Sequence, residues 1–289
     1  MSRVQEQFEE QRASNASGLP HFDAFREHRL QQTQLIERQL AALAPELASS
    51  ARLCVLGAGN CFDLELEHLL TRFSEVHLVD VDASALEGAR GRVAEGPRAR
   101  LVAHAPVDLS GWFEHLDRWA RLQVTPQELM AAPAAGSKRI AQALPGPFEV
   151  VVSTCLLTQL QLTLLNLLGD RHQLFVALRE FLTLTHLRTL SRLTRPGGRA
   201  LLITDLCEAR AFPVGRPRGS ADLAALMSEL TQAGQVIHAA HPGLIDVTLK
   251  DDPVLLRTLG ASEQAAPWLW QNGPDTRFLV YALTLPRLA

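Results

Sequence analysis

The sequence is poor in the features that mark specialised classes of protein. Its four cysteines include no Cys-x-x-Cys pair, so neither a metal site nor a disulfide framework is expected. The most apolar stretch, residues 155–168, is too short to span a bilayer and is interrupted by Gln and Thr. The polar N-terminus is rich in Glu and Gln and carries no secretory signal. We therefore predict a cytoplasmic protein without a membrane partner.

Neither sign of charge is in excess. The 28 Lys and Arg residues nearly balance 31 Asp and Glu residues, and the net charge of −3 argues against the broad basic face of a nucleic-acid binder. Hydrophobic residues make up 47% and charged residues 20%, as in an ordinary globular protein with a large core. The length of 289 residues suits one elaborated domain or two small ones. A nucleic-acid partner is therefore not expected.

Hydrophobic periodicity predicts short strands that alternate with helices. A helix is expected over residues 22–47, where Ile36, Leu40, Leu43 and Leu47 recur on one face. Because parallel strands need long crossovers, the alternation indicates an α/β fold with a parallel sheet and helices on both faces. Strands are expected at residues 52–56, 76–79, 101–103, 148–152, 200–204, 235–239 and 277–284, with further helices at 66–73, 83–93 and 221–232 and a helical stretch reaching residue 193 that divides near Gly169.

Three segments are additional to this alternation. Residues 1–50 form a predicted N-terminal helical extension, and residues 51–289 form the predicted ligand-binding domain. The segments 111–147 and 241–275 are predicted insertions into that domain. Because ligands of open α/β sheets lie beyond the carboxyl ends of the strands, we expect these additions to form a lid over the substrate.

The most informative segment is the Gly-Ala-Gly-Asn turn at residues 57–60, where the first strand ends. Glycine lets the backbone approach a ligand closely, and the free amides of a helix that starts within a few residues favour a negative group. A dinucleotide-binding turn has a third glycine beneath the pyrophosphate, and Phe62 stands there instead. S-adenosylmethionine carries a carboxylate and no pyrophosphate, so this turn favours it over a nicotinamide cofactor.

An acidic residue closes the second strand. Asp80 follows residues 76–79, and a carboxylate at this place can accept hydrogen bonds from both hydroxyls of an adenosine ribose. Asp82 is the alternative, although it lies beyond the strand end and could cap the next helix. A βαβ unit that binds no ligand is the structural alternative for the whole segment.

From residue 52 to the C-terminus the chain resembles the class I S-adenosylmethionine-dependent methyltransferase superfamily. Besides the glycine turn and Asp80, the resemblance includes Arg195-Pro196-Gly197-Gly198 before the fifth strand and the apolar last strand. It implies a Rossmann-like, seven-stranded, mostly parallel sheet with an antiparallel last strand. It also implies a set of residues that bind the cofactor, namely Gly57, Ala58, Gly59, Asn60, Asp80, Val81, Asp108, Leu109, Ser153 and Thr154.

The chain departs from the superfamily's pattern in two places. Cys61 stands where a third glycine is common, which narrows the room near the methionine end of the cofactor. The Asn/Asp-Pro-Pro-Tyr/Phe tetrapeptide of enzymes that methylate base or side-chain amides is absent after the fourth strand, which disfavours a nucleic-acid base as acceptor. Asp108, assigned to the adenine by the resemblance, could equally start a helix.

No catalytic motif stands out, and only isolated polar residues are candidates. His172, Arg179 and His186 are spaced seven apart and would share one stripe of a helix, which could equally be a solvated face. The candidate catalytic residues are His28, His172 and His186. The candidate substrate-binding residues are Arg26, Arg29, Arg179 and Arg210, for which a packing helix or a solvated loop is the alternative.

These observations predict a methyltransferase that uses S-adenosylmethionine on a small-molecule acceptor. Methyl transfer depends mainly on proximity and alignment, so the absence of a catalytic motif does not exclude it. The alternatives are a non-catalytic cofactor-binding or regulatory protein on the same fold and, third, a nicotinamide-dependent oxidoreductase. The N-terminal helix is a candidate element for pairing in a homodimer. The sequence does not identify the acceptor.

Overall fold

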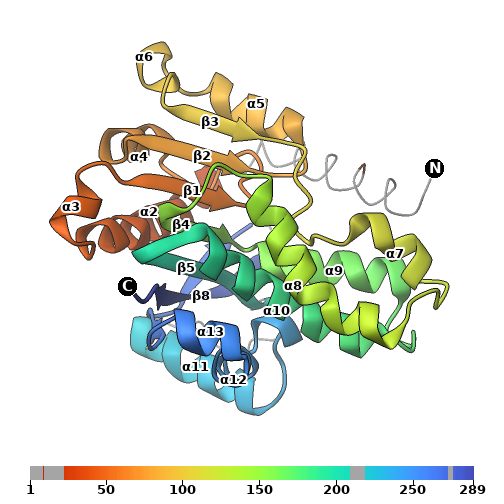
Figure 1. The fold of residues 1–289 in the computed structure, drawn as a ribbon. Helices are drawn as coiled ribbons and strands as arrows, with labels where there is room; N and C mark the ends of the chain where they lie inside the picture. The colour runs from red at the N-terminus through yellow and green to blue at the C-terminus, as the bar shows by residue number, and fades with distance from the viewer. Residues whose placement is uncertain (1–8, 10–22, 209–218, 273–275) are drawn as a thin grey trace.

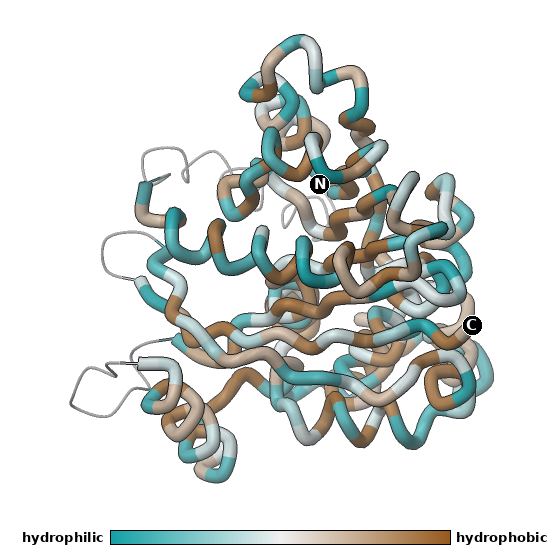
Figure 2. Tube along the Cα trace, turned by 90° about the vertical axis from the view of Figure 1, so that its left-hand side faces the viewer, coloured by the Kyte–Doolittle hydropathy of each residue, from teal (hydrophilic) through white to brown (hydrophobic). Residues whose placement is uncertain are grey.

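A central sheet lies between two layers of helices in the computed structural model (Figure 1). The structure describes Glu9 and residues 23–208, 219–272 and 276–289. Apolar segments gather in the interior, and hydropathy alternates along the outer helices (Figure 2). Among the described residues, no helix combines the length and the apolarity needed to cross a membrane.

The sheet follows the order β3-β2-β1-β4-β5-β8-β6, with β7 also pairing with β8. The first five strands of that order are parallel, and β8 runs antiparallel to β5. The predicted Rossmann-like sheet with an antiparallel last strand is therefore confirmed, although the described part of the chain contributes eight strands instead of seven. They are β1 Arg52–Leu56, β2 Glu75–Val79, β3 Leu101–His104, β4 Phe148–Thr154, β5 Thr194–Glu208, β6 Glu263–Gln264, β7 Trp268–Gln271 and β8 Arg277–Pro286.

One face of the sheet is covered by helices from the first third of the chain. Ile36, Leu69 and Leu86, one from each of the longer helices of this layer, pack with the inner residues of the strands and are almost completely buried. Their burial explains why the spacing of apolar residues predicted these helices. They are α2 Arg26–Ala41, α4 Leu66–Arg72 and α5 Ala83–Gly91, with the short helices α3 Pro45–Ala48 and α6 Glu95–Arg98 between elements.

The other face is covered by helices from the rest of the chain. The predicted division near Gly169 is confirmed, because Gly169 follows the last residue of α9 with φ +78°. The helices of this layer are α7 Phe113–Trp119, α8 Pro126–Gln142, α9 Leu156–Leu168, α10 Phe175–Leu193, α11 Ser220–Gln232, α12 Pro242–Asp251 and α13 Pro253–Thr258, with a 3-10 turn η3 at His238–Ala240.

The predicted strand at residues 235–239 is wrong. The segment follows Gly234 in the turn that ends α11, and the amide of Gln235 still bonds to the carbonyl of Leu230. Only the amide of Ile237 reaches the sheet, at the carbonyl of Leu206, before η3 begins. A short β-branched run after a helix end is therefore insufficient to form a strand here.

Residues 111–147 form part of the helical layer. Helix α8 packs along α10, and Trp112 and Trp119 are each 1% exposed. The Trp112 indole donates to the carbonyl of Ala132 over 3.3 Å. This segment therefore supplies the crossover between β3 and β4.

Candidate functional site

The carboxyl ends of the parallel strands bring three polar positions of the predicted site to one edge. The register pairs Leu56 with Val79 and with Ser153. Gly57, Asp80 and Thr154, each the next residue along its strand, therefore lie side by side. This edge is where open α/β sheets hold their ligands.

The bend after β1 is held by bonds within the protein. The amides of Gly57 and Ala58 both donate to the carbonyl of Val79, over 3.0 and 3.2 Å, and the amide of Gly59 donates to Asp80. Gly57 has φ +72°, and a Cβ there would lie 2.9 Å from Cβ of Leu156. Glycine is therefore required by backbone conformation and by close packing, and the free amides expected at the bend are already used.

The helix predicted at residues 66–73 is confirmed, and it is separated from the bend by a loop. Helix α4 starts at Leu66, and residues 57–65 form an irregular connection. Its course is fixed partly by Cys61, whose φ of 51° is unusual for a residue with a side chain, and whose amide donates to the carbonyl of Ala58. Asn60 is half-buried, and its carbonyl accepts from the Arg92 guanidinium. Helix α4 therefore begins seven residues after Gly59, and its first amides are not part of the bend.

Asp80 faces the bend. Its Oδ2 accepts from the amide of Gly59 over 2.8 Å, and its Oδ1 accepts from the amide of Asp82 over 2.9 Å. The side chain is 8% exposed, and burial raises the pKa of the carboxyl, opposed by these two hydrogen bonds. The carboxylate thus joins the end of β2 to the glycine bend, as the prediction requires, and half-buried Val81 follows it.

Asp82 caps a helix. Its Oδ1 accepts from the amides of Ser84 and Ala85, over 3.0 and 3.2 Å, at the start of α5. This arrangement satisfies the free donors of the first helical turn. Of the two acids weighed for the ribose, Asp80 is therefore the one that lies free of a helix cap.

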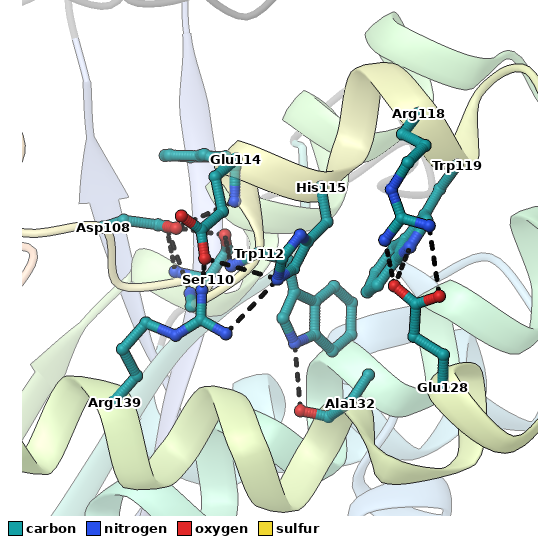
Figure 3. Close-up of polar contacts among 12 residues, drawn as sticks. Asp108, Ser110, Trp112, Glu114, His115, Arg118, Trp119, Glu128, Ala132 and Arg139 are labelled. Atoms are coloured by element: carbon teal, nitrogen blue, oxygen red, sulfur yellow. Dashed lines mark hydrogen bonds and ion pairs between the residues drawn. The ribbon is translucent and has the colours of Figure 1, made fainter. Parts of the chain in front are cut away.

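Asp108 turns back onto its own segment (Figure 3). Its Oδ1 accepts from the amides of Ser110 and Gly111 and from the Ser110 hydroxyl, over 2.9, 3.1 and 2.6 Å. Its Oδ2 accepts from the amide of Phe113 over 2.8 Å. Burial raises the pKa of Asp108 even though these bonds favour the charged form. The alternative of a helix start describes Asp108 well, and the neighbouring Leu109 side chain is buried.

The last two residues of β4, Ser153 and Thr154, contact different parts of the molecule. The Thr154 hydroxyl donates to the carbonyl of Gly57 over 3.0 Å, so Thr154 belongs to the glycine bend. Ser153 instead lies 2.8 Å from Nε2 of His186 on α10, and these two residues are 0% and 1% exposed. Burial lowers the pKa of His186 to about 4, so the ring is neutral near pH 7. Such burial disfavours contact between His186 and a substrate.

Of the three candidates in the N-terminal helix, Arg26 is exposed, whereas His28 and Arg29 are buried. Arg26 is exposed at the start of α2. Arg29 is 7% exposed; its Nε donates to Glu65 over 2.7 Å and its NH1 donates to the carbonyl of Phe62 over 3.0 Å. His28 is 1% exposed and stacks on Trp270 with ring centroids 4.5 Å apart. Two of the three therefore fasten α2 to neighbouring segments.

The predicted stripe of His172, Arg179 and His186 does not form. His172 lies in the connection between α9 and α10, where its Nδ1 accepts from the amide of Leu174 and its Nε2 lies 3.0 Å from the carbonyl of Ala120. Arg179 is half-buried and pairs with its neighbour Glu180. The spacing of seven was misleading because α10 starts only at Phe175. Arg210 lies outside the described residues.

Two acidic residues near the bend were missed. They are Asp63, in the connection after the bend, and Asp205, in β5. Burial raises the pKa of the Cys155 thiol, and the charges of Asp205 and Asp63 raise it further. Burial raises the pKa of each carboxyl to about 6. Asp205 accepts a hydrogen bond from the Thr158 hydroxyl and is 8% exposed. A charged residue inside an apolar strand was the available signal for Asp205, whereas Asp63 carries none.

Comparison with known proteins adds likeness of fold only. No family model and no curated protein matches the chain. A CurJ carbon methyltransferase structure shares 11% identity and a TM-score of 0.48, over 100% of this chain and 62% of that one. The amino pentose methyltransferase CalS10 from Micromonospora echinaspora shares 19% sequence identity at a TM-score of 0.34, and the match covers 60% of this chain and 49% of that one. An rRNA methylase from Streptococcus thermophilus shares 10% sequence identity at a TM-score of 0.42, and the match covers 89% of this chain and 95% of that one.

At these identities and scores the fold assignment depends on the strand order itself. Five parallel strands in the order β3-β2-β1-β4-β5, followed by the antiparallel β8, are what the resemblance to class I methyltransferases implied. The chain therefore has the class I methyltransferase fold.

Proposed function

We propose that the protein binds S-adenosylmethionine and transfers its methyl group to a small-molecule acceptor. The observation that carries this proposal is the position of the Asp80 carboxylate, which faces the glycine bend at the carboxyl edge of the sheet. A ligand placed there would meet a hydrogen-bond acceptor from one strand end and glycine backbone from its neighbour. This pairing suits an adenosine joined to an amino acid.

The carboxylate has acceptor capacity to spare. An ionised Asp offers about four lone-pair positions; the amides of Gly59 and Asp82 use one on each oxygen, and the amide of Val81 makes a smaller contribution. The remaining positions match the two hydroxyls of a ribose. Asp108 has less to offer, because Oδ1 already accepts from three donors. Asp80 is therefore proposed as the main adenosine ligand, and Asp108 as a residue that shapes the adenine end through its own turn.

The proposed reaction requires alignment more than acid–base catalysis. The acceptor atom attacks the methyl carbon while the carbon–sulfur bond breaks and its electron pair goes to sulfur. Holding the reactants in line can supply several orders of magnitude in rate. A base is needed only for an acceptor that arrives protonated. Buried His28 and His186 suit no such role.

A nicotinamide cofactor fits the site less well. Dinucleotide folds place a pyrophosphate at a helix start directly after the glycine turn. Here α4 begins only at Leu66, and Phe62 is 7% exposed beneath the Arg92 guanidinium. No helix start is therefore available at the bend for a pyrophosphate.

One observation favours a non-catalytic protein as a second candidate. The amides of Gly57, Ala58 and Gly59 are occupied by Val79 and Asp80. A fold that keeps the bend for its own stability could have lost the reaction. Measuring product separates this candidate from the enzyme.

The proposal is tested by titrating the purified protein with S-adenosylmethionine, S-adenosylhomocysteine and NADH in a calorimeter. Binding of the first two at micromolar concentration and no binding of NADH are expected. Absence of binding at millimolar S-adenosylmethionine would overturn the proposal. Incubation with a panel of amine, hydroxyl, thiol and carboxyl acceptors then measures S-adenosylhomocysteine formation, and cofactor binding without any product would favour the non-catalytic candidate. A cytoplasmic location and a homodimer stay predictions from the sequence.

A further inference from the structure

Four side chains from three separate segments form one hydrogen-bonded row beside the glycine bend. The Trp268 indole, on β7, donates to Nδ1 of His28, on α2, over 2.9 Å. Nε2 of His28 lies 2.5 Å from Nε2 of Gln32, and the same Gln32 nitrogen lies 3.2 Å from Oδ2 of Asp63. Trp268, His28 and Gln32 are 5%, 1% and 0% exposed. We call these four residues the indole–acid row.

The indole fixes the proton of the histidine. An indole nitrogen only donates, so Nδ1 of His28 must accept and carries no proton. Burial lowers the pKa of His28 to about 3, so the ring is neutral near pH 7 and holds its single N–H proton on Nε2. Nε2 must therefore donate to Gln32.

The histidine in turn fixes the amide of Gln32. The two ends of a carboxamide exchange by a half-turn without any change of shape, so hydrogen bonding decides which end is which. A nitrogen facing Nε2 would place two donors 2.5 Å apart, whereas an oxygen accepts the Nε2 proton. Exchanging the two ends of the amide places its oxygen where Nε2 of Gln32 lies, 2.5 Å from Nε2 of His28 and 3.2 Å from Oδ2 of Asp63.

The last contact of the row joins two oxygen atoms. Two acceptors at this separation attract each other only when a proton lies between them. We propose that Asp63 keeps a proton in the folded protein under conditions in which an ordinary aspartate is ionised, and that the Trp268 N–H at the far end of the row keeps it there. Asp63 is then a positioning residue that donates a hydrogen bond and fastens α2 to the loop behind the glycine bend.

The surroundings of Asp63 are consistent with a neutral carboxyl. Burial raises the pKa of Asp63 to about 6, opposed by its own amide, by Gln32 when the amide nitrogen donates, and by the charge of Arg29. With the amide oxygen facing Asp63, the opposition from Gln32 is absent. The titratable and charged groups that face it are Arg29 from α2, Cys61 from its own loop and Cys155 after β4. Arg29 is bonded to Glu65. Within the described residues, no Lys or Arg forms an ion pair with Asp63.

The protonation of Asp63 does not depend on the proposed function. Its consequence for ligand binding, given next, does rest on that function. The loop that carries Asp63 continues from the bend, on the side where the amino-acid end of the cofactor would lie. A cationic ligand group beside Asp63 would take the place of the proton, reverse the Gln32 amide and break its bond to His28. Ligand binding would then release a proton and loosen α2 from the row.

Removing one N–H group tests the inference without any ligand. In Trp268→Phe the ring stays aromatic, but Nδ1 of His28 is free to hold the proton, Nε2 can accept from Gln32, and Gln32 can donate to an ionised Asp63. We expect the pKa of Asp63, followed by carbon NMR of aspartate-labelled protein and assigned with Asp63→Asn, to fall by one unit or more. Trp270→Phe is the matched control, because Trp270 stacks on His28 but its indole nitrogen has no hydrogen-bond partner among the residues that the structure describes. It should leave the pKa of Asp63 unchanged.

The stability of Asp63→Asn gives a second readout that does not need Trp268→Phe to fold. The neutral amide can donate to Gln32 at every pH. In the natural protein the raised pKa of Asp63 gives stability that is complete below pH 3.8 and is lost as the pH rises through about 6. At pH 8 the variant should therefore favour the folded state by up to roughly 100-fold more than the natural protein, and near pH 4 the two should be alike.

Either of two results would overturn the inference: equal Asp63 pKa values in the natural protein and Trp268→Phe, or an Asp63→Asn variant less stable than the natural protein at pH 8. Neither measurement involves the cofactor, so failure here is distinct from failure of the proposed function. Proton release on binding S-adenosylhomocysteine, measured in buffers of different ionisation enthalpy, then tests the role toward a cationic ligand.

Discussion

Asp80 and Asp108 both follow a strand at the same edge of the sheet, yet their side chains serve different parts of the molecule. Asp80 accepts from the amide of Gly59, which lies 21 residues away along the chain and follows another strand. Asp108 accepts only from residues that are two to five positions away. Sequence distance to the donor therefore separates a carboxylate that bridges two strand ends from one that caps its own turn.

Electrostatics alone would not have made this distinction. Burial raises the pKa of both carboxyls, and backbone hydrogen bonds oppose it at both. The difference lies in the partners, because Asp80 accepts from the amide of Gly59 in the glycine bend, whereas the donors named for Asp108 all belong to its own segment. Three of the four donors to Asp108 are backbone amides of one short segment (Figure 3).

The largest expected effect is on cofactor affinity. Asp80→Ala removes the proposed ribose ligand and should weaken S-adenosylmethionine binding on the order of 100-fold, or about 3 kcal/mol. Asp108→Ala should weaken binding less than tenfold and act mainly on stability, at about 1 kcal/mol for a lost cap. Calorimetric titration and urea unfolding of both variants measure the two effects. A larger loss of affinity for Asp108→Ala would reverse the comparison.

The next effect concerns two glycines, one in each region. Gly111 has φ +70°, and a Cβ there would lie 2.7 Å from Cα of Gly136, so Gly111→Ala should cost about 2 kcal/mol or more of unfolding free energy. Gly57→Ala should cost a similar amount, because of φ +72° and the contact with Leu156. Gly91→Ala is the control, because nothing lies within 4 Å of its added Cβ. Equal stability of all three variants would show that the close contacts do not exist.

A smaller effect is the pH dependence of stability caused by His186, which contacts Ser153 at the end of β4. The pKa of His186 is lowered to about 4, so its stabilising contribution is complete above pH 6.5 and is lost as the pH falls toward 4. Between pH 7.5 and 5.5 the natural protein should lose about 1.4 kcal/mol that His186→Gln, which cannot titrate, does not lose. Denaturant unfolding at both pH values measures the difference. An identical pH dependence in the two proteins would mean that His186 is hydrated.

The smallest effect is at Cys61. Its φ of 51° favours glycine over any residue with a Cβ. We therefore expect Cys61→Gly to be more stable than Cys61→Ala by about 1 kcal/mol, although a protein with alanine at a given position is ordinarily more stable than one with glycine. Comparing the two variants cancels the loss of the buried thiol. The ordinary order of stability at this site would contradict the left-handed backbone.

The sequence predicted the parts of the fold in which one residue pattern decides the structure. The apolar runs at β1, β2 and β4, and the last strand, lie where they were expected, because burial on both faces demands such runs. Helix α8 was missed even though it starts with Thr125-Pro126 and has Glu128 at the third helical position, a typical N-terminal signal. Pro133 concealed it, and the helix nevertheless continues through this residue.

The site was harder to predict because its contacts are distant along the chain. The glycine turn indicates a close approach, but its pattern does not reveal that Val79 takes two of its amides. Likewise, His28 and Trp268 are 240 residues apart, so no spacing connects them. Residue types predict which chemistry is available, and tertiary packing decides which groups remain free.

Hydrogen exchange at the bend tests the central claim most directly. The amides of Gly59 and Asp82 both bond to Asp80, so a ribose held by that carboxylate would slow their exchange. With saturating S-adenosylhomocysteine, we predict marked slowing in peptides covering residues 57–64 and 79–83, and little change around residues 108–113. Binding that leaves the first two peptides unchanged would contradict the proposed site.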